Sequence, residues 1–276
     1  MRRSFQQVDV FTSTPYLGNP VAVVLDADGL STEEMAAVAS WTNLSETTFV
    51  LAPTTAGADY RVRIFTTSSE LPFAGHPTLG TCHAWLRAGG APTVAERTVQ
   101  ECAAGLIPIR RVDDRLAFAA PPLVRQGPVD DATLDEVCAG LEVSRDAVVD
   151  ATWADNGPGW IAVRLASVDD LRALAPVTLR HPVGAVAVTS ADDDVALELR
   201  AFFFAASGVT VEDPVTGSLN ASVAQWLLGS GVLTAPYVAR QGGAIGRAGR
   251  IHVSRSDGEV WIGGDAITLV DGTIEV

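Results

Sequence analysis

The sequence contains no lysine, and this absence excludes several classes of enzyme. All 19 basic residues of the 276-residue chain are arginines. Pyridoxal-phosphate enzymes, Schiff-base aldolases and Walker-A nucleotide-binding proteins each need a lysine amine at the reacting or phosphate-binding position. None of these three classes therefore fits the chain.

Positive charge is also scarce relative to negative charge. The chain has 33 aspartates and glutamates, which give a formal net charge of -14. Binding to nucleic-acid phosphates draws mainly on basic patches, and a surface with this balance repels the phosphate backbone on average. We therefore expect no nucleic-acid partner.

Cysteine and long apolar runs are scarce as well. Cys82, Cys102 and Cys138 form no Cys-x-x-Cys pair, and their odd number favours reduced thiols over a disulfide framework. The first residues lack the apolar core of a signal peptide. No stretch approaches the roughly 20 apolar residues that span a membrane. These patterns predict a cytoplasmic protein with no membrane partner.

Hydrophobic residues make up 47% of the chain, and their periodicity predicts an α+β fold. Short alternating or β-branched runs predict strands at residues 5–11, 21–25, 47–51, 60–65, 106–109, 116–119, 160–165, 185–188, 196–204, 251–253 and 260–262. Helices are predicted at residues 31–41, 78–86, 133–141, 168–174 and 217–228. The first of these helices opens with a capping box formed by Ser31 and Glu34. Ser256-Asp257-Gly258 and Asp271-Gly272 are predicted hairpin turns.

The two halves of the sequence resemble each other at one offset. Residues 21–25 match residues 161–165 at a shift of 140, and Trp85-Leu86 matches Trp226-Leu227 at a shift of 141. This repeat predicts a duplicated unit of about 140 residues and hence two similar domains. Pro121-Pro122 is the best candidate for the linker, because proline resists pairing within a sheet.

Two segments, residues 70–80 and 212–218, have the pattern of a turn that leads into a helix. In both, a carboxylate and a proline precede a glycine, Gly75 or Gly217, that opens the helix. Unpaired N–H groups and the helix dipole make such an end a potential anion site, suited to a substrate carboxylate. Ordinary helix starts with proline in the first turn would explain the same residues.

Three side chains near these segments are candidates for acid–base chemistry. Glu46 stands where a helix has ended and a strand begins, and can be a general base or an exposed strand-entry carboxylate. His76 can be an acid or proton relay, or a histidine with purely local hydrogen bonds. Asp213 can be a partner acid or a helix cap. The four histidines lack the spacing of a metal site, so we expect none.

These motifs occur together, in one order, over nearly the whole chain. The segments are residues 18–24, 43–50, 63–66 with 70–80, 212–218, and 241–242 with 246–247. With them the chain resembles the PhzF-like family, the phenazine-biosynthesis isomerase-like proteins. The resemblance implies two similar domains of the diaminopimelate-epimerase-like fold, each a β-sheet wrapped around a central helix and related by pseudo-two-fold symmetry. We place the N-terminal domain at residues 1–118, with residues 266–276 returning to it, and the C-terminal domain at 119–265.

The resemblance also implies an activity. The expected reaction is a cofactor-independent isomerisation, in which a proton is moved on a small carboxylate-bearing substrate in an interdomain cleft. A homodimer and no cofactor are expected. The family's catalytic positions fall on Glu46, His76 and Asp213, and its carboxylate-binding positions fall on Gly75, Gly217 and Ser218.

Other functions remain open. Epimerases of this fold use two cysteines, but the corresponding segments, residues 73–75 and 213–215, contain none, so two-thiol racemisation is excluded. A non-catalytic small-acid binding protein, or an epimerase with Glu46 and Asp213 as opposing bases, fits the same residues. Trp160 either shapes the pocket or belongs to a core. Arg63 and Arg200, at similar places in the two halves, are interpreted as structural ion-pair partners.

Overall fold

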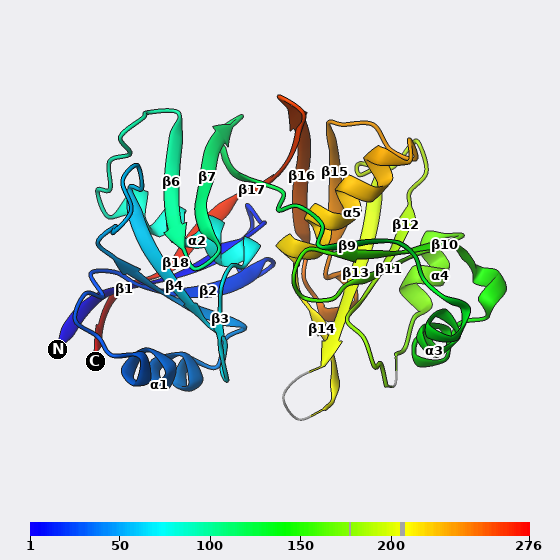
Figure 1. The fold of residues 1–276 in the computed structure, drawn as a ribbon, viewed down its shortest axis with the longest axis horizontal. Helices are drawn as coiled ribbons and strands as arrows, with labels where there is room; N and C mark the ends of the chain where they lie inside the picture. The colour runs from blue at the N-terminus through cyan, green and yellow to red at the C-terminus, as the bar shows by residue number, and fades with distance from the viewer. Residues whose placement is uncertain (177, 205–207) are drawn as a thin grey trace. The chain divides into compact units, whose positions relative to one another are not determined.

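The computed structural model describes residues 1–176, 178–204 and 208–276 of the chain. It divides into two compact units. Unit 1 consists of Met1–Ala119 together with Gly263–Val276, and unit 2 of Ala120–Ile262. Figure 1 follows the chain through both units. That the chain forms two similar domains, at residues 1–118 with 266–276 and at residues 119–265, stays a prediction.

Unit 1 contains one mixed sheet and two helices. Its strands are β1 (Arg2–Val10), β2 (Asn19–Val24), β3 (Glu46–Leu51), β4 (Tyr60–Phe65), β5 (Glu70–Leu71), β6 (Arg97–Cys102), β7 (Gly105–Val112), β8 (Arg115–Ala119) and the returning β18 (Ala266–Glu275). The neighbours run β18-β1-β2-β3-β4-β6-β7-β8, with the short β5 also on β4. The pairs β2–β3 and β4–β6 are parallel and the others antiparallel. The helices are α1 (Thr32–Thr42) and α2 (Gly75–Arg87).

Unit 2 contains a second mixed sheet. Its strands are β9 (Arg125–Pro128), β10 (Val148–Asp155), β11 (Ile161–Leu165), β12 (Val183–Val188), β13 (Leu197–Phe204), β14 (Thr210–Asp213), β15 (Tyr237–Gln241) and β16 (Gly249–Ser256). They pair as β9-β10-β11-β12-β13-β15-β16, with β14 also on β13. The helices are α3 (Asp131–Leu141), α4 (Val168–Ala173) and α5 (Gly217–Gly229), with short 3-10 turns at Arg145–Ala147 and Gly243–Ile245. Strand β17 (Glu259–Gly264) leads from unit 2 into the returning segment.

The strand pairings of the two units repeat each other. In β1-β2-β3-β4-β6-β7 and in β10-β11-β12-β13-β15-β16, antiparallel and parallel pairs alternate in the same order. In each series a short strand and a 13-residue helix, α2 or α5, separate the fourth strand from the fifth. The α+β class is therefore confirmed, and the repeat seen in the sequence corresponds to a repeated topology.

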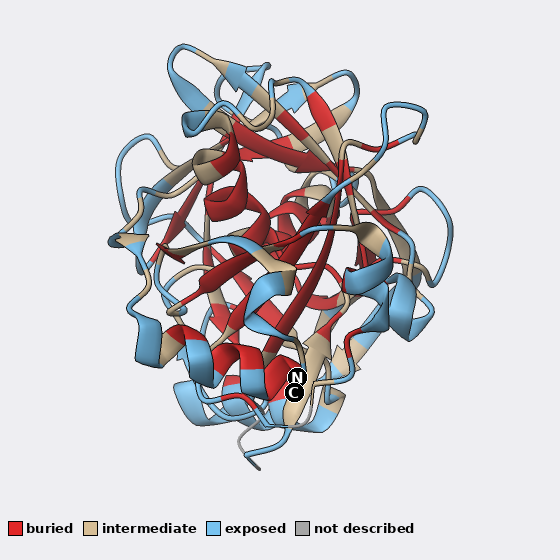
Figure 2. Cartoon of the chain, turned by 90° about the vertical axis from the view of Figure 1, so that its right-hand side faces the viewer, coloured by how far each residue is buried: buried red, intermediate tan, exposed pale blue. Residues whose placement is uncertain are grey.

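Each of these two helices is buried on most sides. Nine of the 13 residues of α2 are buried, as are eight of the 13 of α5. Helix α2 packs against β1, β2, β3, β6, β8 and β18, as expected for a helix with no wide polar face. Its approach to the sheet is so close that a Cβ atom on Gly80 would lie 2.4 Å from a methyl group of Val21. In Figure 2, red marks the buried residues, which gather on inner strands and helices.

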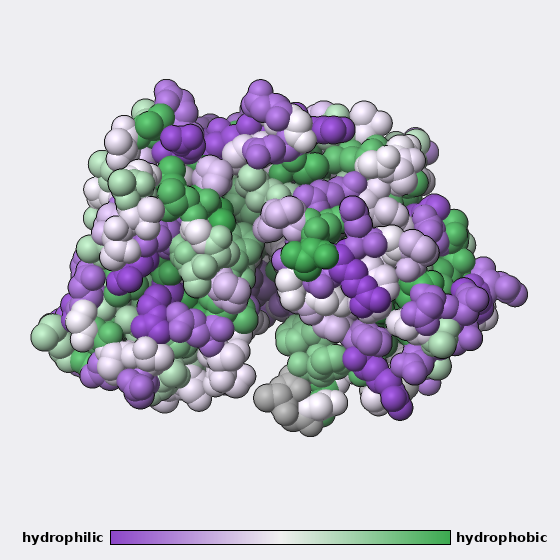
Figure 3. All heavy atoms as spheres, viewed as in Figure 1, coloured by the Kyte–Doolittle hydropathy of each residue, from purple (hydrophilic) through white to green (hydrophobic). Residues whose placement is uncertain are grey.

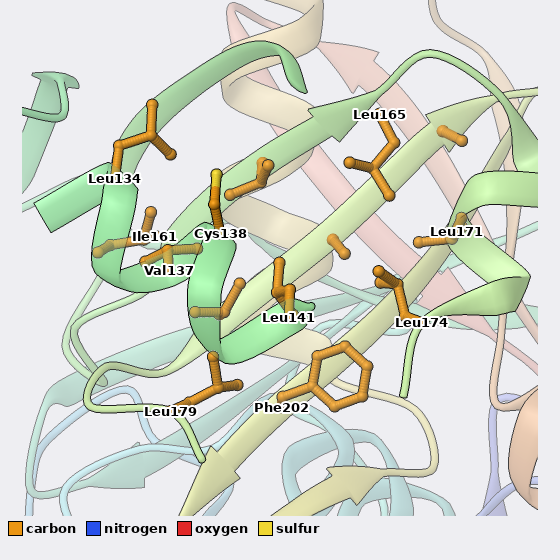
Figure 4. Close-up of a cluster of buried hydrophobic side chains, with 14 of the residues drawn as sticks. Leu134, Val137, Cys138, Leu141, Ile161, Leu165, Leu171, Leu174, Leu179 and Phe202 are labelled. Atoms are coloured by element: carbon orange, nitrogen blue, oxygen red, sulfur yellow. The ribbon is translucent and has the colours of Figure 1, made fainter. Parts of the chain in front are cut away.

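The outer helices cover separate apolar clusters. In unit 1, Met35 and Ala39 of α1 pack on Phe49 and Phe65 of the sheet. In unit 2, α3 and α4 lie over strands of the second sheet, as Figure 4 shows, and the labelled side chains are Leu134, Val137, Cys138, Leu141, Ile161, Leu165, Leu171, Leu174, Leu179 and Phe202. Each fully buried Val, Leu, Ile, Phe or Met side chain stabilises its unit by about 1.5–3 kcal/mol. On the face drawn in Figure 3, hydrophilic and hydrophobic residues are interspersed on both units.

Most predicted elements are present, and one turn is not. All five predicted helices form, and Ser31 and Glu34 make the predicted capping box at α1. The Asp271-Gly272 hairpin is wrong, because both residues lie inside β18, opposite Gln6 and Phe5 of β1. An Asp-Gly pair makes a hairpin only when its flanking segments pair with each other, and here both flanks pair with β1. Among the described residues, no helix is long and apolar enough to cross a membrane.

Candidate active site

Three side chains meet in unit 1 where two parallel strands and a helix begin. Glu46 is the first residue of β3, Asn19 the first of β2, and His76 the second of α2. His76 Nε2 lies 3.3 Å from Glu46 Oε2, and its Nδ1 lies 3.3 Å from Asn19 Nδ2. The parallel pairing of β2 with β3, which sets Val21 opposite Glu46, brings the two strand starts together. Sequence reasoning named Glu46 and His76 but missed Asn19.

Burial keeps the imidazole of His76 uncharged. Removal from water lowers the pKa of His76 to about 3, and a hydrogen bond with the main chain of Pro20 opposes this lowering only in part. Its contact with Glu46 is therefore not an ion pair at neutral pH. The Glu46 side chain is 15% exposed, whereas that of His76 is 6% exposed. The carboxylate is thus the more accessible member of the pair.

The N-terminus of α2 adds a potential anion site beside this pair. The helix begins at Gly75, and no side chain caps its N-terminal residue, Ala74. Pro77 has no N–H, and the N–H of Thr78 donates to Ala74 O, so Gly75 and His76 carry the first amides of the helix. Gly75 thus opens the helix as predicted. A carboxylate near these amides would be favoured by the helix dipole.

The other three predicted residues lie in unit 2, at the corresponding helix. Asp213 ends β14, and Gly217 and Ser218 are the first two residues of α5. No side chain caps the N-terminal residue of this helix, Thr216. The Thr216 hydroxyl instead donates a hydrogen bond to Asp213 Oδ2, and Asp213 is buried. The six predicted residues therefore form two groups of three, one at the start of α2 and one at the start of α5.

Two further side chains, Trp160 and Asn156, hold Ser218 in place. Trp160 Nε1 donates to Ser218 Oγ at 3.0 Å, and Asn156 Nδ2 donates to Ser218 O at 2.8 Å. Because an indole N–H can only donate, Ser218 Oγ accepts this bond and keeps its own proton for another acceptor. Trp160 is buried, so it both fills a core and contacts a predicted site residue. Asn156 was missed; its signal was the Asp155-to-Gly159 turn, in which Asp155 accepts two main-chain N–H bonds.

The two arginines interpreted as structural do form ion pairs. Arg63 bonds both carboxylate oxygens of Glu70, each at 2.7 Å. Arg200 bonds Glu212 in the same way, at 3.1 and 2.7 Å. Each pair joins two neighbouring strands, β4–β5 or β13–β14, just before a central helix. The repeat of the two units thus extends to their ion pairs.

None of the three cysteines stands at the first residues of α2 or α5. Cys82, Cys102 and Cys138 are all unbridged and buried, and burial raises the pKa of the Cys82 thiol to about 12. Such a thiol is protonated and a poor base at neutral pH. Among the residues that the structure describes, no three His, Cys, Asp or Glu side chains form a group that could hold a metal ion.

A surface hollow of about 480 Å³ lies elsewhere on unit 1. It contains none of the six predicted residues. Its lining residues are His83, Leu86, Arg87, Arg111, Asp114, Arg115, Leu116, Gly264, Asp265 and Ala266.

Comparison of the sequence with known families and proteins gives consistent matches. The family model for phenazine biosynthesis-like proteins, PhzC-PhzF, matches residues 8–272. The trans-2,3-dihydro-3-hydroxyanthranilate isomerase of Pseudomonas fluorescens is 35% identical, covering 97% of both chains. An uncharacterized isomerase of Pasteurella multocida is 30% identical over 99% of this chain and 94% of its own. The antisense-enhancing sequence 1 protein of Schizosaccharomyces pombe is 40% identical over 180 residues, and the chain spans only 61% of its length.

Solved structures share the fold. A phenazine biosynthesis protein of the PhzF family from Bacillus anthracis has a TM-score of 0.84 at 23% identity, with both chains covered completely. A probable proline racemase from Agrobacterium radiobacter has a TM-score of 0.60 at 13% identity, covering 99% of this chain and 92% of its own. At these identities the structural likeness is evidence of a common fold alone.

Proposed function

The chain belongs to the PhzC-PhzF family of phenazine biosynthesis-like proteins and is an isomerase of that family. On this premise, we propose that it moves a proton on a small carboxylate-bearing substrate with Glu46 as the general base. The observation that carries the proposal is the placement of Glu46. It is a partly exposed carboxylate against a buried, uncharged imidazole at the open end of a helix.

Glu46 has the properties that a base at carbon needs. A carboxylate next to a cation is a weak base, because the positive charge stabilises its ionised form. The group beside Glu46 is neutral, since His76 titrates far below neutral pH. The 15% exposure of Glu46 leaves room for contact with a ligand. A positioned base of this kind contributes about 10²- to 10⁴-fold to the rate.

The helix starts supply the groups that hold the substrate and its developing charge. We assign the substrate carboxylate to the first amides of α5, at Gly217 and Ser218, and to the Ser218 hydroxyl, which Trp160 leaves free to donate. When the C–H proton leaves, the negative charge spreads onto the substrate, and amides such as that of Gly75 stabilise it. Asp213 is assigned as the partner acid, which hydrogen-bonds the substrate oxygen that becomes negative, while Glu46 alone transfers the proton at carbon.

Glu46 is assigned both the removal and the return of the proton. Delivery by His76 would require a protonated imidazole, which burial disfavours in this position. Protonated Glu46, by contrast, is the direct product of the first step and needs only a second substrate carbon within reach. His76 then serves to orient the carboxylate. The reaction as written needs no cofactor.

The test is deuterium incorporation from D₂O into trans-2,3-dihydro-3-hydroxyanthranilate, the substrate named for the Pseudomonas fluorescens relative. We expect wild-type protein to isomerise the compound and to introduce deuterium at carbon, because the proton on partly exposed Glu46 exchanges with solvent before it returns to the substrate. Glu46→Gln should fold normally and lose at least about 100-fold in rate. Glu33→Gln, which changes an exposed carboxylate on α1, is the matched control and should retain full activity.

Each outcome separates this function from the alternatives. Deuterium incorporation that is unchanged in Glu46→Gln would overturn the assignment of the base. Inversion of a stereocentre without movement of a double bond would identify an epimerase that uses carboxylate bases. Saturable binding of the compound with no exchange in wild-type protein would identify an acid-binding protein. A homodimer, which the family resemblance implies, is tested by sedimentation of the same preparations.

A further inference from the structure

Gln241 is a buried amide whose hydrogen bonds converge on the start of α5. It is the last residue of β15 and is 1% exposed. Its Oε1 accepts from Thr216 N at 3.0 Å and from Asn220 Nδ2 at 2.9 Å. Its Nε2 donates to Asp213 O at 3.0 Å and to Thr216 Oγ1 at 2.9 Å. The two donors and two acceptor positions of the amide are therefore all used, and two of the bonds reach Thr216.

The polarity of this network is fixed by its donors. The Thr216 main-chain nitrogen can only donate, so the oxygen end of the Gln241 amide must face it, and the NH₂ end must face the Thr216 hydroxyl. A hydroxyl that accepts a bond from this NH₂ group has one proton left to give. That proton goes to Asp213 Oδ2. The donors in this network are therefore fixed. The Gln241 NH₂ group donates to the Thr216 hydroxyl, and the Thr216 hydroxyl donates to the Asp213 carboxylate.

A second buried glutamine occupies the matching position in unit 1. Gln100 lies 141 residues before Gln241, the offset at which the two halves of the sequence repeat. It is fully buried on β6, which pairs in parallel with β4 as β15 does with β13. Its Oε1 accepts from Tyr60 OH at 3.0 Å, and its Nε2 donates to Thr78 Oγ1 at 2.9 Å.

The two glutamines differ in what they hold. Both tie a strand to a threonine in the first turn or N-cap of the central helix. In unit 1 the threonine is Thr78, inside α2, and the other partner is a tyrosine. In unit 2 the threonine is Thr216, the N-terminal cap residue, which bonds a carboxylate. The shared tie to the helix is structural in both units, and the added link to Asp213 belongs to Gln241 alone.

We propose that Gln241 is a positioning residue for the isomerisation, which directs the Thr216 hydroxyl onto Asp213 and so sets the orientation of that carboxylate toward the substrate. This inference rests on the proposed function, in which Asp213 is the partner acid. Gln241 itself need not touch the substrate. Its effect is on the rate of proton movement, whereas the groups assigned to substrate binding, Gly217 and Ser218, are not bonded to it.

The test is Gln241→Glu, which keeps the shape and the acceptor oxygen but removes the donor. A glutamate can still accept from Thr216 N and Asn220 Nδ2, but it has no N–H to give. The Thr216 hydroxyl then has a second carboxylate to bond and no longer needs to face Asp213. We expect kcat for isomerisation of trans-2,3-dihydro-3-hydroxyanthranilate to fall by about 10- to 100-fold, with KM changed by less than about threefold.

Gln100→Glu is the matched control. It makes the same substitution at the equivalent buried site, without contact to Asp213 or Thr216. Both variants should lower the thermal unfolding midpoint by similar amounts, because each puts a carboxylate in the place of a buried amide. Only Gln241→Glu should lower kcat. An equal loss of kcat in both variants, or a loss in Gln241→Glu that appears in KM instead, would overturn the proposal.

A double-mutant cycle tests the route through Thr216. Thr216→Val removes the hydroxyl, so adding Gln241→Glu to it should lower kcat no further. Additive losses would show that Gln241 acts in another way.

Crystals of Gln241→Glu separate this inference from the proposed function. If wild-type protein fails to turn over the compound, the proposed function fails, and the position of the Thr216 hydroxyl still decides the role of Gln241. Loss of the contact between Thr216 Oγ1 and Asp213 Oδ2 would support the positioning role, and its retention would refute it.

Discussion

His76 Nε2 lies 3.3 Å from Glu46 Oε2, yet the two residues do not form an ion pair, because burial lowers the pKa of the imidazole to about 3. A histidine and a glutamate this close are often read as a charged couple. Here the histidine contributes shape and hydrogen bonding and no charge. The low pKa of His76 should make the free energy of unfolding depend on pH, and this can be measured without any substrate.

The first prediction concerns the stability of the protein in acid. An unfolded histidine titrates near pH 6.5, so between about pH 6.5 and 3 the unfolded state binds a proton that folded His76 does not. The free energy of unfolding should therefore fall as the pH drops through this window. His76→Gln should remove this contribution, which is on the order of 3 kcal/mol between pH 7 and 4.

The measurement is urea unfolding of both proteins at pH 7 and at pH 4. Carboxylates also titrate over this range, so only the difference between the two proteins reports on His76. Wild-type protein should lose more stability than His76→Gln on going to pH 4. An equal loss in the two proteins would mean that His76 is not held neutral in the folded state.

The second prediction concerns Trp160, whose indole bonds the Ser218 hydroxyl at 3.0 Å. Trp160→Phe keeps an aromatic ring but removes the N–H donor. The Ser218 hydroxyl then has no bond from Trp160 that fixes the orientation of its own proton. Binding of a small carboxylate such as anthranilate should weaken by about 0.5–1.5 kcal/mol, or roughly two- to tenfold in Kd. Isothermal titration gives the Kd.

Trp153→Phe is the control for this change. Trp153 is also buried in unit 2, but it stacks with Arg125 and makes no bond to Ser218. Its variant should bind anthranilate as wild-type protein does. In a Ser218→Ala background, Trp160→Phe should have no further effect on the Kd. A further loss there would show that Trp160 acts by filling space and not through the hydroxyl.

The third prediction uses the two equivalent ion pairs. Arg200 and Glu212 have side chains only 9% and 7% exposed, whereas Arg63 and Glu70 are 24% and 35% exposed. Arg200 also donates to the carbonyl oxygens of Leu171 and Leu174. Arg200→Met should thus cost about 3–5 kcal/mol of unfolding free energy, because it leaves Glu212 buried without its partner. Arg63→Met should cost about 1 kcal/mol or less.

Chemical denaturation of the two variants under the same conditions checks this contrast. The pairs join equivalent strands, so the difference between them reports on the burial of the Arg200 pair together with the main-chain bonds that Arg200 makes. Similar losses in the two variants would contradict the argument.

Local sequence patterns were sufficient for much of the fold. The capping box of Ser31 and Glu34 and the glycines that open α2 and α5 are short-range signals, and the structure has them where predicted. The strand that ends in Gln241 was not predicted, because it follows a proline and its last two residues, Arg240 and Gln241, are both polar and do not alternate. The Asp271-Gly272 turn failed because pairing with a strand at the other end of the chain overrode a local preference.

Candidate site residues could be named from the sequence one by one, but their contacts could not. Glu46 and His76 were singled out from their places at a strand start and a helix start, and their catalytic roles stay a prediction. Their meeting with Asn19 depends on the parallel pairing of β2 with β3 and on the packing of α2, which local patterns do not encode. The bond from Trp160 to Ser218 joins residues 58 positions apart in the chain. Sequence alone therefore left Trp160 undecided between a pocket and a core, and the structure shows it buried, with its indole bonded to Ser218.

The last prediction distinguishes this chain from two-thiol enzymes of the same fold. Racemisation by a pair of thiols needs reactive cysteines at the two helix starts, and here those positions carry none. Cys82 lies inside α2 with no exposure, and the pKa values of all three thiols are raised by burial. Iodoacetamide, which reacts with the thiolate, should therefore leave native protein unmodified and its isomerase activity intact.

Mass spectrometry after the same treatment in urea provides the control and should show three alkylated cysteines. The variant with Cys82→Ala, Cys102→Ala and Cys138→Ala should keep the wild-type kcat. It should be less stable than wild-type protein, because each substitution removes a buried sulfur. Loss of activity in native protein at the rate of alkylation would mean that a thiol takes part in the reaction, and the carboxylate assignment of Glu46 would then have to be abandoned.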